Sequence, residues 1–547
     1  MKIRVDTQEK DFPQPVTVEE VLKELLPGVD ALGAFSNGRV LELGRHLEKD
    51  CELEPITYAH EEGRRIYERS LRFVLILASY RLFPERTLRF EHSLGTGVYV
   101  RFLDGSCTPE DTERLQSEMK RIVQSDLPFV KQDCTKQEAI DYFASLGMQD
   151  KVKLLSYRPE DHFHVYSCGD MKEYFYGPML PSTGRVRVFG LHLCAEGFVM
   201  LLPCKYDAAT LSEPAELPMH LQAFRLSNYW CRVLKCSNAA DLNDMIAEGR
   251  YREFIRVNEA LQDEAIADIA ESIHARKARA IFIAGPSSSG KTTFANRLSI
   301  HLRVLGYTPK MISLDDFYRN RADLIPEENG QPDLEALDAL DVPLIRECIG
   351  KLLRGEEAPM PRFDFHSQSR LPERVPMKLR DGEILLVEGI HGLNPALHQG
   401  FERNDIFKVF ITELTCLNLD DHNRIRTTDA RLLRRVVRDY QFRGTKVEDT
   451  LAMWKSVRAG EDKWIFPYQE QADVVINSAL HYELPLLRTL ALDALRNLER
   501  DNVVYPIARR LIKILRYFLP APEEAYRDIP PTSIVREFVG GNTFYEE

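Results

Sequence analysis

Residues 280–293 read Ala280-Ile-Phe-Ile-Ala284-Gly285-Pro-Ser-Ser-Ser-Gly290-Lys291-Thr292-Thr293, and this stretch decides how the C-terminal half is interpreted. Its apolar start predicts a buried strand, and the G-x-x-x-x-G-K-T string after it predicts a phosphate-binding loop that opens a helix. Backbone N–H groups of such a loop and of the helix N-terminus form a concave surface for polyphosphate. We predict the nucleotide-binding residues Gly285, Pro286, Ser287, Ser288, Ser289, Gly290, Lys291, Thr292 and Thr293, with Lys291 on the β/γ-phosphates and the Thr292 hydroxyl on Mg²⁺.

Further segments rich in β-branched and apolar residues follow this loop and alternate with helical stretches. The strands that we expect after Ala280–Ala284 are Lys310–Leu314, Glu383–Val387, Ile406–Ile411 and Asp473–Asn477. Their spacing suits right-handed crossovers between parallel strands that are buried on both faces. The sequence therefore predicts an α/β fold of the phosphate-loop NTPase type, with helices on both faces of a parallel sheet.

Two carboxylates follow strands of this predicted sheet. Asp315 comes directly after the second strand, where it can accept a proton from a substrate hydroxyl or hold Mg²⁺. The alternative is a helix N-cap with a solvated neighbour. Glu388 follows the strand Ile384–Val387 and resembles the metal-side carboxylate of phosphate-loop enzymes. We predict Thr292 and Glu388 as the Mg²⁺ ligands.

Two other segments of the C-terminal half are candidates for the active site. In Pro361–Arg370, two aromatic residues bracket an acid, which suits a nucleobase and a sugar hydroxyl, although a packed surface loop is an equal alternative. Asn423 to Lys446 is rich in arginine, and a solvated helix face explains several of these residues. Arg435, Arg438 and Arg443 recur near helical spacing and can cover the phosphates as a lid.

The strings GPSSSGKTT, LDDFYR, PRFDFHSQSR, VEGIHGL and RLLRRVVRDYQFRG, in this order, resemble the uridine–cytidine kinase branch of the uridine kinase and phosphoribulokinase family. The resemblance covers about Ala278 to Leu480 and implies a kinase that uses ATP, or GTP, with Mg²⁺. By motif, Asp315 matches the general base for the sugar 5′-hydroxyl. The implied catalytic residues are Asp315, Lys291, Arg435, Arg438 and Arg443, and the implied substrate-binding residues are Tyr318, Phe363, Asp364, Phe365, Gln368 and Arg370.

Three positions depart from the pattern of that family. Gln368 stands where a base-reading His is expected, Phe363 stands where Tyr is expected, and Thr445 replaces a further lid Arg. We therefore expect an intact phosphotransfer machinery and altered recognition of the base.

The front half mixes strands and helices. Lys2–Val5 is an expected strand, and Thr17 with Glu20 predicts a capping box that opens the helix Val18–Leu26. Longer helices are expected at Glu62–Leu82 and Pro109–Ser125, strands at Arg185–Leu191 and Gly197–Leu202, and a helical connector from Asn228 to about Arg276. A basic amphipathic helix is expected from Tyr505 to about Phe518.

Residues 1 to about 225 resemble the N-terminal part of threonyl-tRNA synthetase, through Ile66–Pro84, Pro109–Pro128 and Gly177–Gly184. The resemblance implies a small, ubiquitin-like TGS domain and a domain that edits mischarged tRNA. The editing centre normally carries an HxxxH and a CxxxH pair, and here those four positions read Arg69, Phe73, Phe175 and Met179. We expect neither metal binding nor His-assisted hydrolysis there. His162, His164 and Cys168 lie nearby in sequence and are interpreted as structural rather than as metal ligands.

The composition of the 547 residues suits a folded chain, with 44% hydrophobic and 29% charged residues. A net charge of −12 argues against a nonspecific nucleic-acid binder. The start shows no apolar signal core, and the stretch Phe73–Tyr80 is too short to span a bilayer, so we expect a soluble cytoplasmic protein without a membrane partner. The expected units are a TGS-like domain (1–60), a degenerate editing-like domain (61–227), a connector (228–275), a kinase domain (276–490) and a C-terminal helical tail (491–547).

These observations favour an ATP- and Mg²⁺-dependent kinase for the hydroxyl of a nucleoside or related sugar. The alternative is an RNA-binding or translation-linked protein whose nucleotide site acts as a switch. A switch needs no acceptor pocket, whereas this chain retains a base candidate, aromatic residues and a lid together. The expected partner is a small-molecule substrate, while RNA contact through the front half and assembly into a homo-oligomer stay open.

Overall fold

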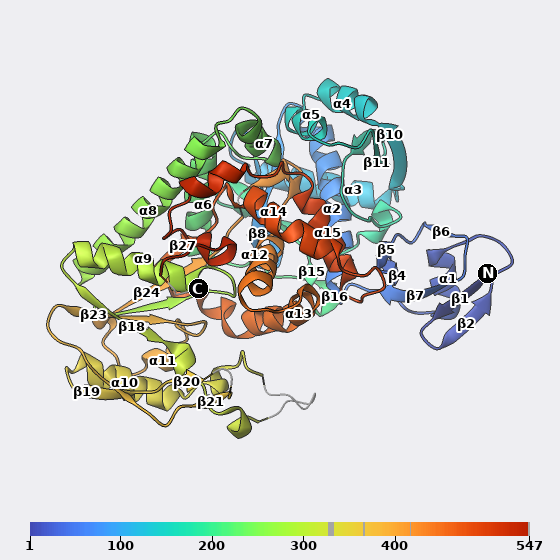
Figure 1. Cartoon of the computed structure of the whole chain (residues 1–547). Helices are drawn as coiled ribbons and strands as arrows, with labels where there is room; N and C mark the ends of the chain where they lie inside the picture. Colours follow the sequence, from blue (N-terminus) through green and yellow to red (C-terminus); the bar gives the residue numbers. More distant parts are fainter. Residues whose placement is uncertain (326–332, 365–366, 416, 545–547) are drawn as a thin grey trace.

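The computed structural model describes residues 1–325, 333–364, 367–415 and 417–544, and its elements are labelled in Figure 1. The N-terminal unit is a five-stranded sheet of order β2-β1-β7-β4-β5, covered by α1 (Val18–Leu25). The predicted capping box of Thr17 and Glu20 is present at the start of α1. The strands are β1 (Lys2–Val5), β2 (Gln8–Asp11), β4 (Gly33–Ser36), β5 (Arg39–Leu41) and β7 (Cys51–Ile56).

The next unit is built around α2 (Glu61–Leu82), which is buried along most of its length. An antiparallel sheet of order β13-β14-β9-β8 and α3 (Pro109–Gln124) pack against α2. A second sheet, β10-β11-β12, carries α4 (Lys136–Ser145) and α5 (Gln149–Ser156). The strands are β8 (Leu88–Leu94), β9 (Gly97–Phe102), β10 (Val130–Thr135), β11 (His162–Cys168), β12 (Met171–Glu173), β13 (Gly190–Cys194) and β14 (Gly197–Leu201).

The strand expected over Arg185–Leu191 is wrong in this unit. A 3₁₀ turn occupies Thr183–Arg185, and a strand begins only at Gly190. The backbone N–H of Val188 donates to the Tyr67 hydroxyl at 2.9 Å, and that hydroxyl donates to the Val188 carbonyl at 2.8 Å. A side chain therefore satisfies backbone groups that a neighbouring strand would otherwise pair.

Three helices connect this unit to the rest of the chain: α6 (Pro218–Val233), α7 (Ala239–Ala247) and α8 (Tyr251–Arg276). The stretch from Asn228 to Arg276 is therefore mostly helical, as expected. The boundary proposed between residues 227 and 228 falls inside α6, and the one proposed between 490 and 491 falls inside α14 (Glu483–Arg496).

The C-terminal half contains the predicted parallel sheet, of order β18-β23-β17-β24-β27. Successive residues of β17 point into different cores: Ile281 and Ile283 join the cluster that contains α8 and α9, and Phe282 joins the cluster that contains α10. The sheet is therefore covered by helices on both faces, which confirms the expected α/β class. The strands are β17 (Ala280–Ala284), β18 (Thr308–Ser313), β23 (Glu383–Glu388), β24 (Ile406–Thr412) and β27 (Val474–Asn477), and the helices include α9 (Lys291–Val304), α10 (Val342–Leu353), α12 (Thr427–Phe442) and α13 (Val447–Trp464).

Buried polar contacts join the two halves. A hairpin of β25 (Asn418–Asp420) and β26 (Asn423–Arg424) reaches into the front half, where Asp420 Oδ1 accepts from Lys151 Nζ at 2.8 Å. Arg65 of α2 donates to both carboxylate oxygens of Asp429 in α12, at 3.0 and 2.8 Å. Helix α15 (Tyr505–Leu515) lies beside α2 (Figure 1), and Arg510 pairs with Glu62. These contacts between the front half and the C-terminal half therefore help to hold α12 and the β25–β26 hairpin in place.

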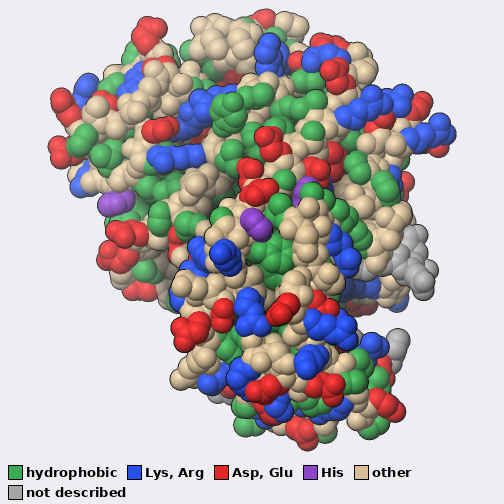
Figure 2. Space-filling view, turned by 90° about the vertical axis from the view of Figure 1, so that its left-hand side faces the viewer, with side chains coloured by type: hydrophobic (Ala, Val, Ile, Leu, Met, Phe, Trp, Pro, Cys, Tyr) green, Lys and Arg blue, Asp and Glu red, His purple; other side chains and the backbone are tan. Residues whose placement is uncertain are grey.

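Figure 2 shows one face of the molecule, on which positive and negative side chains are interspersed and a lobe stands out below the main body. Among the described residues, no helix is long and apolar enough to cross a membrane.

Candidate active site

The phosphate-binding loop lies between β17 and α9, as predicted. A Cβ atom on Gly285 would lie 1.9 Å from the Ile411 carbonyl oxygen, so only glycine fits there. Gly290 has a φ of +81° and directly precedes α9. Within the described residues, the buried hydroxyls of Ser288 and Ser289 have no hydrogen-bond partner. A loop with unsatisfied donors is suited to accept an anionic ligand.

The predicted metal ligands lie at one edge of the sheet. Thr292 is the second residue of α9, and its hydroxyl lies 3.5 Å from Glu388 Oε2 at the end of β23. The Ser313 hydroxyl, from the neighbouring strand β18, lies 3.3 Å from Glu388 Oε1. Burial, and then the nearby Asp315 charge, raise the pKa of Glu388 to about 7. The carboxylate of Glu388 and the Thr292 hydroxyl place oxygen atoms close together, and oxygen is the ligand atom that Mg²⁺ prefers, so Thr292 and Glu388 fit a Mg²⁺ ion.

Lys291 and Asp315 lie close enough to influence each other. Burial lowers the pKa of Lys291, while Glu388, Glu537 and Asp315 oppose this effect. Burial raises the pKa of Asp315, and Lys291 opposes this rise. Lys291 Nζ donates to the Pro286 carbonyl at 3.1 Å. The structure therefore brings together a cation for phosphate and an acid whose proton affinity is increased.

The three predicted lid arginines differ in their contacts with the phosphate loop. Arg435 Nη1 donates to the Ser287 hydroxyl of the phosphate loop at 2.8 Å. Arg438 Nη2 lies 3.0 Å from Asp439 Oδ1. The Arg443 side chain is 58% exposed and lies 3.7 Å from the same carboxylate oxygen. Only Arg435 of these three donates a hydrogen bond to the loop within the described part of the chain.

Sequence reasoning missed two arginines that brace the loop from α12. Arg431 Nε donates to the Ser287 carbonyl at 2.9 Å, and its guanidinium also pairs with Glu461. Arg434 Nη1 donates to the Ser288 carbonyl of the loop at 3.4 Å, and the side chain pairs with Glu483 at 2.5 Å. Both belong to the arginine-rich segment that the sequence singled out, but their burial depends on tertiary packing.

Two acids next to the loop were also missed. Glu461 of α13 accepts a hydrogen bond from the Ser287 N–H at 2.9 Å. Glu537 of α16 (Arg536–Val539) accepts from the Thr293 hydroxyl at 2.8 Å. No local pattern marks these residues, because each lies far along the chain from the loop that it contacts.

The predicted acceptor side lies next to Asp315. The Phe363 N–H donates to Asp316 Oδ1 at 3.3 Å, which ties the hairpin of β20 (Phe363–Asp364) and β21 (Ser369–Arg370) to the end of β18. The rings of Tyr318 and Phe363 are 5.7 Å apart. Asp364 accepts from the Ser367 N–H at 3.1 Å within the same hairpin. Phe365 lies outside the described residues.

The other two residues predicted on this side have partners within the protein. Arg370 donates to the carbonyls of Phe317 and Tyr318, at 2.9 and 2.7 Å, and to Asp341 at 3.0 Å. Gln368 has a φ of +53° and accepts from Arg321 Nη1 at 2.8 Å. In this structure Arg370 braces the loop that follows Asp315.

The degenerate editing positions form a packed cluster. Phe73, Phe175 and Met179 are buried, with the rings of Phe73 and Phe175 5.6 Å apart, and Arg69 lies over the ring of Tyr176. His162 and His164 are exposed on β11, whereas Cys168 is buried and its pKa is raised by burial to about 12. Across the residues that the structure describes, no group of three or more His, Cys, Asp or Glu side chains is arranged to hold a metal ion.

The parallel sheet, the glycine-bounded loop and the acids at the strand ends define a phosphate-loop kinase-like domain. Residues 280–484 match the model of the phosphoribulokinase/uridine kinase family, which supports a phosphotransferase without identifying its acceptor.

The N-terminal part is similar to threonine–tRNA ligases. It is 37% identical over 190 residues to that of Symbiobacterium thermophilum and 33% identical over 186 residues to that of Desulforamulus reducens. These alignments cover 34% and 33% of this chain, and this chain spans only 29% of the length of each ligase.

Two solved structures are also similar to part of the chain. A possible uridine kinase from Bacillus stearothermophilus is 20% identical, covers 39% of this chain and 98% of its own, and gives a TM-score of 0.28. D-glycerate 3-kinase from Cryptococcus neoformans is 19% identical, covers 51% of this chain and 89% of its own, and gives a TM-score of 0.22.

Proposed function

We propose that this chain transfers the γ-phosphoryl group of Mg²⁺-bound ATP, or GTP, to a hydroxyl of a nucleoside, in the way that uridine kinases use the 5′-hydroxyl, or of a related sugar. The observation that carries the proposal is the meeting of Glu388 and Asp315, at the ends of the adjacent parallel strands β23 and β18, with Lys291 at the start of α9. Brought together in this way, these groups can bind phosphate, hold a divalent cation and accept a proton.

Each group has a separate role in this proposal. Asp315 accepts the proton of the acceptor hydroxyl. Its pKa is raised toward the pH of the reaction, which favours its action as a general base. Lys291 and Arg435 stabilise the negative charge that spreads over the transferring group. Thr292 and Glu388 would hold Mg²⁺, which would supply positive charge against the phosphates. Tyr318 and Phe363 offer aromatic surface to the acceptor.

A panel of nucleosides and pentoses tests the proposal. With Mg²⁺ and ATP or GTP, we expect acceptor-dependent release of the nucleoside diphosphate for at least one member of the panel. The proposal would be contradicted if the protein bound the triphosphate but no acceptor increased the release of the nucleoside diphosphate.

That contradictory outcome would favour the second candidate, a translation-linked or RNA-binding protein whose nucleotide site is a switch. One observation favours this candidate: Arg65 of the synthetase-like part pairs with Asp429 in α12, which also carries Arg431 and Arg435 next to the phosphate loop. Helix α12 therefore contacts both the phosphate loop and the front half, so a movement of the loop on nucleotide binding can be passed to the front half. RNA contact through that half belongs to this second proposal.

Replacement of Arg435 by Ala is expected to reduce kcat by about 100-fold, because it removes a donor that is already placed at the loop. Arg443→Ala is the matched control from the same predicted lid, and its exposed side chain predicts a loss of less than about tenfold. Steady-state kinetics with a fixed acceptor distinguish the two variants. Equal losses would show that the observed placement of Arg435 has no special role.

Replacement of Gln368 by His is expected to shift the preference toward pyrimidine nucleosides by about tenfold in kcat/KM, because it restores the residue type that reads the base in the resembling family. Gln368→Asn is the control, since it keeps an amide and tolerates the positive φ. The panel is measured for both variants. An unchanged ranking in Gln368→His would show that this position does not read the base.

A further inference from the structure

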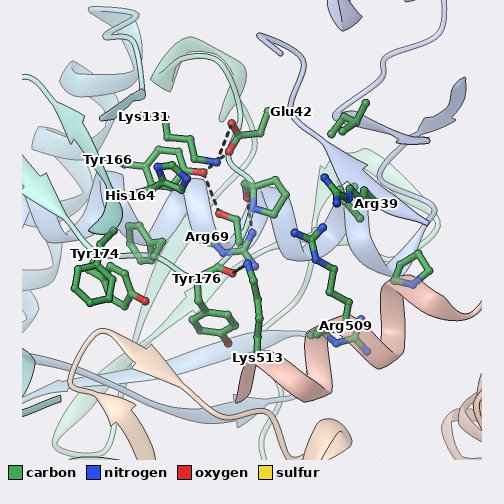
Figure 3. Close-up of a pocket in the computed structure, with 18 of the residues that line it drawn as sticks. Arg39, Glu42, Arg69, Lys131, His164, Tyr166, Tyr174, Tyr176, Arg509 and Lys513 are labelled. Atoms are coloured by element: carbon green, nitrogen blue, oxygen red, sulfur yellow. Dashed lines mark hydrogen bonds and ion pairs between the residues drawn. The ribbon is translucent and has the colours of Figure 1, made fainter. Parts of the chain in front are cut away.

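A cleft of about 460 Å³ lies between the N-terminal sheet, the editing-like unit and helix α15 (Figure 3). No residue of the phosphate loop is among its described lining residues. Its lining includes nine Lys or Arg side chains and only three Glu side chains. Arg69 and Phe175, two of the residues at degenerate editing positions, are part of this lining. Because α15 follows the kinase-like domain in the sequence, the cleft is complete only when both halves are docked.

The three acids of the cleft are already engaged by the protein. Glu42 accepts from the Tyr166 hydroxyl and from the Met179 N–H. Glu62 pairs with Arg510, and Glu160 pairs with Arg158 and Arg516 at 3.0 and 2.5 Å. These acids therefore leave most of the positive charge of the cleft uncompensated.

Several cations converge without a counter-ion (Figure 3). Within the described residues, the side chains of Arg39, Arg45 and Arg509 make no hydrogen bond or ion pair, and Arg39 and Arg509 approach each other from opposite walls. The buried Nε of Arg69 has no partner among the described residues either. Like charges held together in this way are unfavourable unless an anion joins them.

Lys513 lies among four other cations of the cleft. Lys513 is exposed, but partial loss of solvation in the cleft lowers its pKa to about 8, and neighbouring cations add to the shift: Arg509 from α15 itself, Arg69 from α2, Lys131 from β10, and Arg158 from the segment between α5 and β11. Its ammonium donates to the Tyr176 carbonyl at 3.0 Å. His162 and His164 also line the cleft. An anion that enters the cleft would raise the proton affinity of Lys513 again.

We propose that this cleft binds a small organic phosphate of nucleotide size with at least two negative charges. Arg39, Arg509 and Lys513 face its phosphates, and Tyr176 and His164 border the space left for its organic part. The cavity volume lies within the range of small-molecule sites. A long single strand of RNA suits the cleft less well, because a cavity of about 460 Å³ has the size of a small-molecule site.

The test measures binding of a non-hydrolysable ATP analogue to the full chain by calorimetry, in the wild type, in Lys291→Ala and in Arg509→Glu/Lys513→Glu. We expect two binding events in the wild type. Lys291→Ala is expected to weaken the event at the phosphate loop, and the double reversal to weaken the other by about 100-fold. Lys120→Glu/Lys455→Glu carries the same change in net charge outside the cleft and is expected to keep both events.

The pH dependence provides a second readout. Between pH 7 and 9, binding in the cleft is expected to weaken and to take up a proton as Lys513 loses its charge, which appears as a buffer-dependent heat. The double reversal is expected to abolish this proton uptake while the phosphate-loop event persists.

Several results would overturn the proposal. They are a single binding event in the wild type that the double reversal leaves intact, two events that the double reversal leaves intact, or tighter cleft binding of a short RNA oligonucleotide than of the nucleotide. Thermal unfolding identifies a misfolded variant, and Arg509→Gln/Lys513→Gln then replaces the double reversal with the same expectation. Because the measurement needs no phosphotransfer, its outcome is independent of the proposed kinase activity.

Discussion

Lys291→Ala and Asp315→Asn are each expected to reduce phosphotransfer by about 10²–10⁴-fold, with little change in thermal stability. Lys291 supplies positive charge at the phosphates, and the loss of its ammonium removes that stabilisation in the transition state. Asp315→Asn keeps the size of the side chain but removes its ability to accept a proton. Initial rates of acceptor-dependent diphosphate release measure both effects.

Asp316→Asn is the matched control for Asp315→Asn. Asp316 is the adjacent carboxylate, and it accepts from the Phe363 N–H at 3.3 Å, a role that an amide oxygen can keep. We expect a change of less than about threefold for this variant. If both Asn variants lose activity equally, Asp315 acts through the structure of the loop rather than as a base.

Asp429→Ala is expected to cost about 3–5 kcal/mol of stability, the largest such effect that we predict. Asp429 is buried at the start of α12, where it pairs with Arg65 at 2.8 Å and with Arg510 at 3.2 Å. Its removal leaves these guanidinium groups without that counter-charge at the contact between the halves. Chemical denaturation followed by circular dichroism measures the loss, and limited proteolysis shows whether the halves separate.

The exposed ion pair of Arg4 and Glu52 serves as the control for the stability loss expected in Asp429→Ala. Glu52→Ala removes the partner of Arg4 in a pair whose side chains are 59% and 53% exposed, and we expect less than about 1 kcal/mol. An Asp429→Ala protein as stable as Glu52→Ala would show that the buried cluster does not hold the two halves together.

The sequence predicted those parts of the fold that rest on local patterns. The strand Ala280–Ala284 matches β17, and the capping box of Thr17 is present, because continuous apolar runs and caps depend on neighbouring residues. The strand expected near Val186 was wrong because the Tyr67 hydroxyl, distant in sequence, satisfies the backbone of Val188.

The candidate site was predictable to the same extent. The phosphate loop, Asp315 and Glu388 follow strands directly, so their convergence was expected from the parallel sheet. The contacts of Glu461 and Glu537 with the loop were not, because they join segments that no motif connects. The basic cleft was also invisible, since Arg39, Arg69 and Lys513 come from three distant segments.

The most direct test of the central claim is mass spectrometry of the acceptor after incubation with ATP labelled with ¹⁸O on its γ-phosphate oxygens and Mg²⁺. The account predicts an acceptor monophosphate that carries the label, formed in equal amount with ADP and about 10²–10⁴-fold more slowly with Lys291→Ala. The account would be contradicted if the label were found only in inorganic phosphate, the product of hydrolysis, while every nucleoside and pentose stayed unmodified.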